Sequence, residues 1–579
     1  MATAQVNENP RYEPNEACSH LEAAGVGLQI ILMMVAGKVL FVALILGAGG
    51  QSEPYLSWAI FMTLVVCGVG TILQALQIKR FGAGHLVIMS VHPAHVPICI
   101  MALLTGGPSL MLSLIVVSSL FQLLLTPYMS LLRRIITPAV SGTLLMLVAA
   151  ISIPPVFGLL ENTSSFTSPT SYAAMIAAGT LIFMVVLMLL VPQKLQLWTA
   201  LIGITAGCLA AIPFGFYDFQ VVREAAWIGF PEFAWPGIQA PGREFFTLLP
   251  AFVAVSLTLF IKSVGDTVAV QQVSWRRPRA ADFRLIQGGL YANGVGGILS
   301  GLSGTIPSTG SATAVSIISI TSVASIRVAF YIGAFFILAA CLPKIAAIVL
   351  GIPGFIMVSY MLIMIAFLFM EGVRTVVREG IDRKKIIVVG VSFWVGVAFD
   401  GGYIYPELFE GLWSALLVNG LASGGICAVL ITLFIELTSP RRSRLSTDLH
   451  ISSLAKIDEF LTEFASRANW NETSVSRLRS VGEETLSIML VDDVENDGQP
   501  DLNRLIITAR HVEDTAELEF LAVSDEENLQ DRLSYLSDQP ETVDEREISF
   551  RLLRHYASSV QHHKYQNVDI VSVEVEGSR

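Results

Sequence analysis

Charged side chains are scarce in this sequence. They make up 14% of its 579 residues, whereas hydrophobic residues make up 53%. Soluble globular domains carry about 25% charged residues, so this deficit argues against an ordinary soluble chain. Many apolar stretches reach the roughly 20 residues that an α-helix needs to cross a bilayer. The composition therefore predicts an all-α polytopic membrane protein, with the lipid bilayer as its surroundings.

The sequence also lacks the motifs of metal binding and of common enzyme chemistry. Its six cysteines are scattered, without the spacing of a disulfide framework or a metal site. It contains no phosphate-loop lysine motif, no zinc-ligand spacing and no serine-hydrolase elbow. We therefore expect no enzyme, no primary pump, no cofactor and no metal. The basic stretch WRRPRAADFR at 275–284 is explained by a cytoplasmic loop, so nucleic acid is not an expected partner.

A cleavable signal peptide is missing as well. The first residues, MATAQVNENPRYEPNEACSHLEAAG, are polar and acidic, with no basic segment followed by an apolar one. The first span is then its own insertion signal. Residues 1–22 are predicted to form a cytoplasmic N-terminal segment.

Fourteen apolar ranges within a membrane domain at 23–438 are interpreted as spans. They are 25–47, 56–78, 84–104, 109–126, 138–160, 171–191, 197–214, 244–266, 284–304, 307–323, 326–343, 345–371, 384–400 and 410–436. Basic residues gather in the loops after even-numbered spans, such as Lys79 and Arg80, while the alternate loops contain few. Because cytoplasmic loops carry an excess of Lys and Arg, both termini are predicted to be cytoplasmic, at the inner (plasma) membrane.

The composition changes abruptly after the last span. From 441 to 579 the chain carries 15 Lys and Arg against 28 Asp and Glu, a net charge of −13. KIDEFLTEF has the period of an amphipathic helix, while RLIITA and VDIVSVEVEG are typical of strands. A chain of this length can bury its own core. Residues 445–579 are therefore predicted to form a cytoplasmic α+β domain.

Two segments differ from ordinary spans. GAGHLVIMSVHPAHVPICIMAL at 82–103 and GTIPSTGSATAVSIISITS at 304–322 are interrupted by Gly, Pro, Ser and Thr, and they lie seven spans apart. Non-helical backbone in a bilayer is tolerated only where it is buried or lines a cavity. Paired broken helices in inverted repeats are a common plan of transporters. The pattern predicts two inverted seven-span repeats whose broken spans form a binding site.

A basic and an acidic residue stand inside one apolar run. Lys262 and Asp266, in FIKSVGDTVAVQQ, are four residues apart and therefore share one face of a helix. Charges within a span are costly and usually face a cavity or a partner. Two interpretations are open here: an ammonium that binds an anion, or an internal ion pair that holds two helix segments together.

These segments resemble the nucleobase–ascorbate transporter family, which includes the bacterial uracil and xanthine permeases. The resemblance spans residues 20–435 and rests on GVGLQIILMMVAGKVLFVALILGAG, on KSVGDTVAV and on the following FRLIQGGLYANGVGGILSGLSGTIPSTGSATAVSIISITSVASIRV. It implies a core domain and a gate domain, short strands beside the substrate in the third and tenth spans, and a homodimer with elevator-like movement. The implied activity is secondary-active transport of a nucleobase-like small molecule, with H⁺ or Na⁺ as the candidate coupling ion.

The resemblance indicates substrate-binding residues in the first, third, eighth and tenth spans. They are Gln29, His92, Ala94, His95, Lys262, Asp266, Ser308, Thr309, Gly310, Ser311 and Thr313. Lys38, His95 and Asp266 are candidates for proton coupling or an ion pair.

Several of these residues depart from the usual pattern of the family. Lys262 replaces a glutamate, Thr313 falls near the second acid, and the segment that begins at His92 replaces an aromatic pair. A carboxylate would accept hydrogen bonds from a neutral base, whereas an ammonium only donates them. An anionic heterocycle, a carboxylate or a small inorganic anion would therefore suit Lys262.

Lys38 and the two histidines have more than one interpretation. Lys38 could contact the substrate, pair with Glu371 or Asp400, or extend along a water-filled face. His92 and His95 could couple protons, because histidine titrates near neutral pH, or could simply cap free carbonyls.

The tail is similar in order to the small ATPase-like domains of anti-sigma-factor kinases, through HISSLAKIDEFLTEFASRANWNETSVSRLRSVGEETLSIML and the segments after it. Glu483 and Glu484 match the acids of that family, but Ile488 stands where its asparagine is expected, and there is no Asp-x-Gly-x-Gly box. An interaction or dimer-stabilising role is expected rather than kinase activity.

Three functions are consistent with these features. The favoured one is transport of a nucleobase-like substrate. The second is transport of an inorganic or carboxylate anion on the same fold, and the third is a transporter-like sensor that signals through the tail. The sequence leaves the substrate, the coupling ion and the direction of transport open.

Overall fold

The computed structural model describes two compact units. The described residues are 10–129, 137–158, 160, 170–192, 198–217, 219–276, 279–311, 313–377, 380, 382–404, 420–438, 442–490, 504–512, 515–522, 545–565 and 569–577. We call Asn9–Ser274 with Gly288–Ile435 the membrane unit, and Trp275–Gln287 with Glu436–Arg579 the tail unit.

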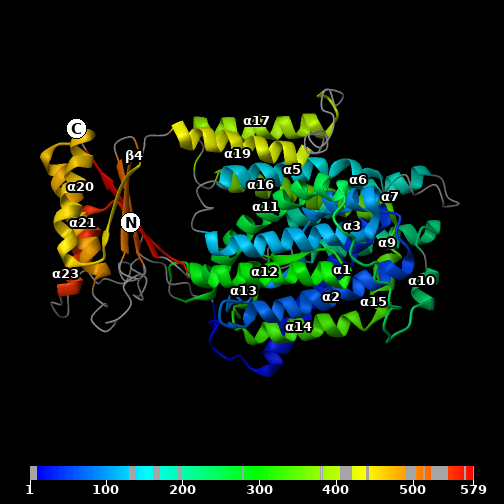
Figure 1. The fold of residues 1–579 in the computed structure, drawn as a ribbon. Helices are drawn as coiled ribbons and strands as arrows, with labels where there is room; N and C mark the ends of the chain where they lie inside the picture. The colour runs from blue at the N-terminus through cyan, green and yellow to red at the C-terminus, as the bar shows by residue number, and fades with distance from the viewer. Residues whose placement is uncertain are drawn as a thin grey trace. The chain divides into compact units, whose positions relative to one another are not determined.

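Apolar helices make up most of the membrane unit (Figure 1). Among the described residues, seven helices are long and apolar enough to cross a bilayer: α1 (His20–Ala48), α2 (Glu53–Ala75), α3 (His95–Leu125), α7 (Thr170–Leu190), α11 (Arg243–Ser274), α16 (Gly354–Val377) and α19 (Gly420–Thr438). The other helices are α5 (Pro138–Ile151), α6 (Ile153–Phe157), α9 (Thr199–Ala211), α10 (Phe219–Glu224), α12 (Phe283–Ser303), α13 (Thr313–Thr321), α14 (Arg327–Ala340), α15 (Pro343–Leu350) and α17 (Arg383–Asp400).

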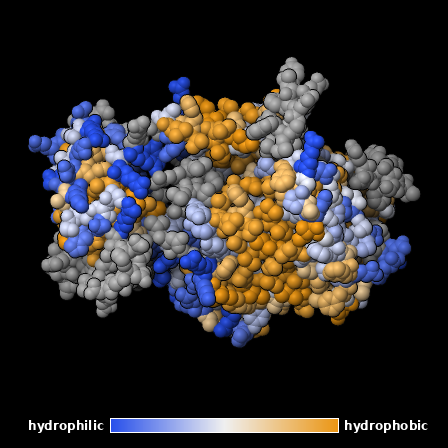
Figure 2. Space-filling view, viewed as in Figure 1, coloured by the Kyte–Doolittle hydropathy of each residue, from blue (hydrophilic) through white to orange (hydrophobic). Residues whose placement is uncertain are grey.

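The surface of the membrane unit is suited to lipid. The face shown in Figure 2 is largely hydrophobic. Large apolar side chains such as Leu189, Leu190 and Phe434 are exposed on the membrane unit. The helical membrane protein expected from the composition is therefore confirmed. An eighth candidate span consists of α14 and α15, which meet at 75°. The count of fourteen spans stays a prediction, and residues 410–419 of the last expected span lie outside the described residues.

Helix α3 consists of two helices that meet at a kink. Gly106 and Gly107 have non-helical backbone angles, and φ at Gly107 is +76°, a region that glycine adopts readily. Pro108 follows and has no backbone N–H for the preceding turn. The sequence GGP therefore ends one apolar helix and begins the next, at the boundary expected between the ranges 84–104 and 109–126.

Helix α16 packs closely on α5 through glycine. A Cβ atom on Gly372 would lie 2.7 Å from the carbonyl oxygen of Gly142 and 2.7 Å from Cγ of Met146. Small residues commonly allow such close approach between membrane helices. Because Glu371 adjoins Gly372, this contact also fixes the direction in which the Glu371 side chain leaves α16.

Two short strands lie where the sequence predicts broken spans. β1 (Ile88–Val91) precedes α3, and β2 (Ser308–Ser311) precedes α13. The strands pair antiparallel, with Met89 opposite Gly310 and Ser90 opposite Thr309. The expected interruptions of the helical pattern within 82–103 and 304–322 are thus confirmed. Each strand supplies backbone hydrogen-bond partners for the other, which makes extended backbone tolerable inside a membrane protein.

The described part of the tail unit contains a five-stranded antiparallel sheet of order β3-β4-β5-β7-β6 and three helices on one of its faces (Figure 1). The elements are β3 (Ser443–Asp448), α20 (Leu454–Arg467), α21 (Glu472–Met489), β4 (Arg504–Val512), β5 (Thr515–Ala522), α23 (Glu545–Tyr556), β6 (Ser559–Lys564) and β7 (Asp569–Glu576). Alternate residues of β5, Ala516, Leu518 and Phe520, are fully buried, as in a strand with one covered face. Leu461 and Leu478 extend the same core from the helices.

Ile488 belongs to this core. It lies on α21, and only 3% of it is exposed, whereas Glu483 lies at the surface and Glu484 is partly exposed. Ile488, which the resemblance to the kinase family aligned with an asparagine, therefore packs in the core between helix and sheet.

We predict that a fragment of residues 442–579 does not bind ATP with magnesium. Magnesium needs oxygen ligands in near-octahedral geometry, and the buried Ile488 side chain offers none. Calorimetric titration of the fragment with ATP and magnesium chloride should give no saturable heat beyond that of titration with ATP alone. Saturable binding that depends on magnesium would contradict this prediction and would favour a regulatory role for the tail.

Candidate functional site

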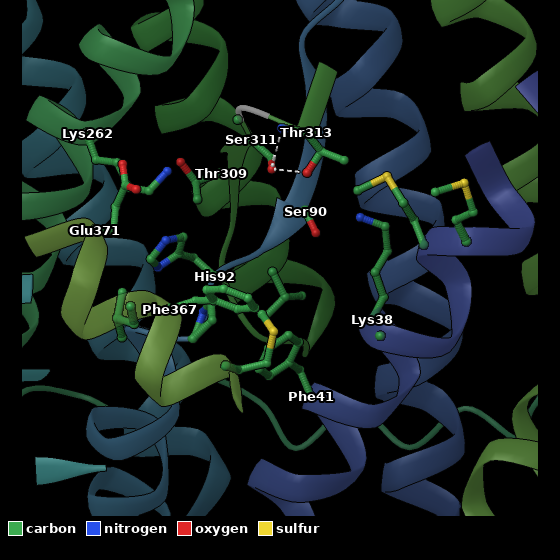
Figure 3. A pocket seen from close by; sticks show the side chains of 18 of the residues that line it. Lys38, Phe41, Ser90, His92, Lys262, Thr309, Ser311, Thr313, Phe367 and Glu371 are labelled. Atoms are coloured by element: carbon green, nitrogen blue, oxygen red, sulfur yellow. Dashed lines mark hydrogen bonds between the residues drawn. The ribbon is translucent and has the colours of Figure 1, made fainter. Parts of the chain in front are cut away.

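A cavity of about 390 Å³ lies among the helices and strands of the membrane unit (Figure 3). It is lined by Met33, Met34, Gly37, Lys38 and Phe41 of α1; Ser90, Val91, His92 and Pro93 in and after β1; Lys262 of α11; Thr309, Gly310, Ser311 and Thr313 in and after β2; and Tyr360, Met364, Phe367, Leu368 and Glu371 of α16. The two interrupted segments, the first helix and the helix with the intramembrane charges therefore meet at one place, and α16 closes it.

Side chains from neighbouring helices hold the outer edges of the β1–β2 pair. The N–H of Met89 donates to Oγ1 of Thr71 over 3.0 Å, and the N–H of Gly310 donates to Oδ1 of Asn293 over 2.9 Å. The carbonyl of Met89 accepts from Nζ of Lys38 over 2.7 Å. In an antiparallel ladder, alternate residue pairs direct these groups away from the partner strand. Here α1, α2 and α12 provide the missing partners.

Asn293 is the centre of this support on the β2 side. Its Oδ1 also accepts from Nε2 of Gln74 over 2.8 Å, and the same nitrogen of Gln74 donates to the carbonyl of Gly289 over 3.0 Å. A Cβ atom on Gly310 would lie 2.9 Å from Val87 and 3.2 Å from Oδ1 of Asn293. Glycine at 310 thus lets the strand approach its acceptor.

Lys262 and Asp266 form the ion pair that their spacing allows. Nζ of Lys262 donates to Oδ2 of Asp266 over 2.7 Å, and their side chains are 15% and 10% exposed. Lys262 lines the cavity, whereas Asp266 lies behind it and is not among the lining residues. The two interpretations of this pair are therefore compatible: Asp266 orients an ammonium that retains donors for a ligand.

Lys38 is almost fully buried. Only 1% of it is exposed, its Nζ donates to the carbonyl of Met89, and the ammonium lies 4.7 Å from the centre of the Phe336 ring. It pairs with neither Glu371 nor Asp400 among the described residues, and it does not reach a water-filled outer surface. Its observed contacts give it a structural role at the edge of β1, and its place in the cavity wall adds positive charge there.

The two histidines have different positions. His92 lines the cavity, and its Nδ1 accepts from the N–H of Ala94 over 3.2 Å. His95 begins α3, is 5% exposed and does not line the cavity; its backbone N–H donates to the carbonyl of His92 over 3.0 Å. These local hydrogen bonds satisfy the backbone N–H groups of Ala94 and His95. Of the two histidines, His92 is the one whose ring a ligand in the cavity can reach.

Six of the residues expected to bind substrate line the cavity, namely His92, Lys262, Thr309, Gly310, Ser311 and Thr313. Asp266 acts on it through Lys262. Gln29 does not line it, because it lies one helical turn, about 6 Å, before Met33, the first lining residue of α1. Ala94, His95 and Ser308 are buried behind the wall, where Oγ of Ser308 lies 3.4 Å from that of Ser300.

None of the residues that the sequence analysis expected to bind substrate lies on α16. Its lining residues Tyr360, Met364, Phe367 and Glu371 are spaced by four, three and four, and therefore share one helical face. This spacing in an otherwise apolar run, together with an acid at its end, was the available signal. The sequence interpretation treated Glu371 only as a partner of Lys38.

The cavity presents two different walls. Lys262, His92 and the hydroxyls of Thr309, Ser311 and Thr313 provide hydrogen-bonding groups on the side of the strands. Phe41, Phe367 and Tyr360 provide aromatic surface. A few convergent polar groups with apolar and aromatic walls are typical of sites for small organic ligands. In the described part of the chain, no group of His, Cys, Asp or Glu residues could hold a metal ion.

We predict that Asn293→Leu lowers the stability of the protein by about 1–3 kcal/mol, because the buried N–H of Gly310 loses its acceptor and the amide of Gln74 loses one of its acceptors. Thermal unfolding of the purified protein in detergent measures this change. Ser319→Ala, which removes an exposed hydroxyl from α13, is the control and should change stability by less than about 0.5 kcal/mol. An Asn293→Leu protein as stable as the wild type would show that this network does not hold β2.

Comparison with known proteins gives consistent matches over this unit. A profile described as the Permease family matches residues 21–400. The putative purine permease CPE0397 of Clostridium perfringens is 25% identical over 420 residues, covering 71% of this chain and 89% of that protein. The uric acid permease PucK of Bacillus subtilis is 26% identical, covering 74% and 98%. The xanthine permease XanQ of Escherichia coli is 26% identical, covering 71% and 90%.

Proposed function

Because the chain belongs to the permease family, and is thus a membrane transporter rather than an enzyme, we propose that it carries an oxidised purine such as urate or xanthine by secondary-active transport. Uric acid, xanthine and purine are the compounds in the names of its relatives. The cavity supplies the geometric support for this proposal.

The observation that carries the proposal is that Lys262 and several aromatic side chains line one cavity. A flat heterocycle can lie against Phe367 or Phe41 while its exocyclic carbonyl oxygens accept hydrogen bonds from the ammonium and from hydroxyls near β2. Urate is largely anionic at neutral pH, so an ammonium suits it better than a carboxylate would. A strongly hydrated inorganic anion would gain little from the aromatic wall.

The cavity also supports an alternating-access mechanism of the elevator type. One wall of the cavity comes from α1, β1, α11 and β2, which are held together by the β1–β2 pairing, by Lys38 and by the hydroxyl contact of Ser263 with Thr309. Its other wall comes from α16, which packs on α5, α6, α7 and α9. We infer that the first group is the moving core and that the second belongs to the gate. A homodimer in the inner membrane, with cytoplasmic termini and a regulatory or dimer-stabilising tail, completes the proposal.

Uptake into liposomes tests the proposed function. We expect saturable, protein-dependent accumulation of urate or xanthine, and much weaker uptake of acetate and bicarbonate, relative to liposomes without protein. Uptake of an inorganic or carboxylate anion alone would replace the purine proposal. Purine binding to the purified protein without any uptake or exchange would favour a sensor instead.

We predict that Lys262→Gln weakens urate binding by about 1.5–3 kcal/mol, because the ligand loses a hydrogen bond from a charged donor. Binding is measured by calorimetry on the purified protein. Lys344→Gln is the matched control, since Lys344 lies on α15 outside the cavity and donates to the backbone carbonyl of Ala225. A folded Lys262→Gln protein with wild-type affinity would exclude the anion site at Lys262.

A further inference from the structure

One carboxylate of the cavity is left without a role in the proposed function. Glu371 lines the cavity from α16 and is partly exposed. In the part of the chain that the structure describes, its carboxylate makes no hydrogen bond or ion pair, whereas the other nearby carboxylate, Asp266, is bound to Lys262. Figure 3 shows Glu371 and Lys262 at the same end of the cavity.

The charges in and beside the cavity come from a small set of groups. Lys262 and Asp266 contribute from α11 and His92 from the turn after β1, while Lys38 contributes from α1, on the other side of the view in Figure 3. On α16 itself, Arg374 is exposed and does not line the cavity, and Tyr360 is the other titratable lining group. The helices α5, α6, α7 and α9, which pack against α16, contain no Asp, Glu, Lys, Arg or His.

The sum of these charges depends on the protonation of Glu371. With His92 neutral and Glu371 ionised, the two ammonium groups and the two carboxylates cancel. An anionic purine would then bring an uncompensated negative charge into a poorly hydrated cavity, which is unfavourable. With a protonated Glu371 the cavity carries one positive charge, and the same anion restores neutrality. Anion binding and protonation of Glu371 therefore favour each other.

We propose that Glu371 is the proton-binding group that couples transport, and that it takes up one proton with each anionic purine. This inference rests on the proposed function. The proton comes from the aqueous phase on the side of entry, binds a carboxylate oxygen of Glu371, and leaves to the opposite side when the anion dissociates. No covalent bond other than this O–H bond forms or breaks, and the overall movement is electroneutral. Lys262 recognises the anion throughout, and Asp266 keeps that lysine in place.

The first test uses Glu371→Gln, whose neutral amide resembles the protonated carboxyl. Liposomes with the wild-type protein should accumulate urate when the outside is more acidic, and the variant should lose this accumulation by about tenfold or more. Exchange of urate between equal pH values should stay within about threefold of the wild type, because the anion still meets a positively charged cavity. Glu244→Gln is the matched control: Glu244 is exposed at the start of α11 and outside the cavity, and this variant should keep proton-driven uptake.

Each alternative result has a distinct meaning. Proton-driven accumulation by Glu371→Gln would overturn the inference, as would loss of exchange in a variant whose thermal unfolding matches the wild type. Absence of any purine transport by the wild-type protein would instead overturn the proposed function itself.

A second measurement needs no variant to fold. Urate binding to the purified wild-type protein in weakly buffered solution should consume protons, which a pH-sensitive dye detects as a rise in pH. The rise should follow the saturation of the site. Saturable urate binding without proton uptake at neutral pH would overturn the role of Glu371.

Discussion

Inside a membrane protein, every backbone N–H and C=O must find a partner, and this requirement shapes the whole candidate site. An unpaired group in the hydrocarbon region costs several kcal/mol. The chain interrupts two helices to expose backbone near a ligand, and the exposed groups must be satisfied without water. Pairing of β1 with β2 satisfies the inner edges. Thr71, Asn293 and Lys38 satisfy outer groups of Met89 and Gly310, which ties α1, α2 and α12 to the strands.

The same requirement explains why a lysine is tolerated in the first helix. A buried ammonium is costly unless it is hydrogen-bonded. Lys38 replaces a missing partner at the strand edge, so its charge and the carbonyl of Met89 satisfy each other. Among the described residues no carboxylate pairs with Lys38, so the charge of the site depends on groups that line the cavity from other helices.

The sequence predicted the features that depend on local composition or on residue spacing within one segment. Gly, Pro, Ser and Thr in 82–103 and 304–322 indicated the interruptions, and the spacing of Lys262 and Asp266 indicated a shared helical face. The orientation of single side chains was not predictable in this way. Gln29 lies one turn of α1 before the first lining residue, and His95 lies at the start of α3, away from the cavity. The residues around each position do not predict this placement. Glu371 joins the site through the packing of α16, more than a hundred residues after Lys262.

The position of the Glu371 carboxylate has a mechanical consequence. By the family resemblance, an acid is usual at the position of Lys262. In this chain that position lies on the same wall of the cavity as the strands. Here Glu371 lies on α16, on the opposite wall, while the ammonium stays with the strands. If the strands move relative to α16, the electrostatic interaction between Lys262 and Glu371 changes with that movement, because it depends on their separation. The protonation of Glu371 is then linked to the relative position of the two walls as well as to the charge of the ligand. A single acid–base pair divided between the walls can thus connect proton binding to movement, which two groups fixed on one rigid body cannot do.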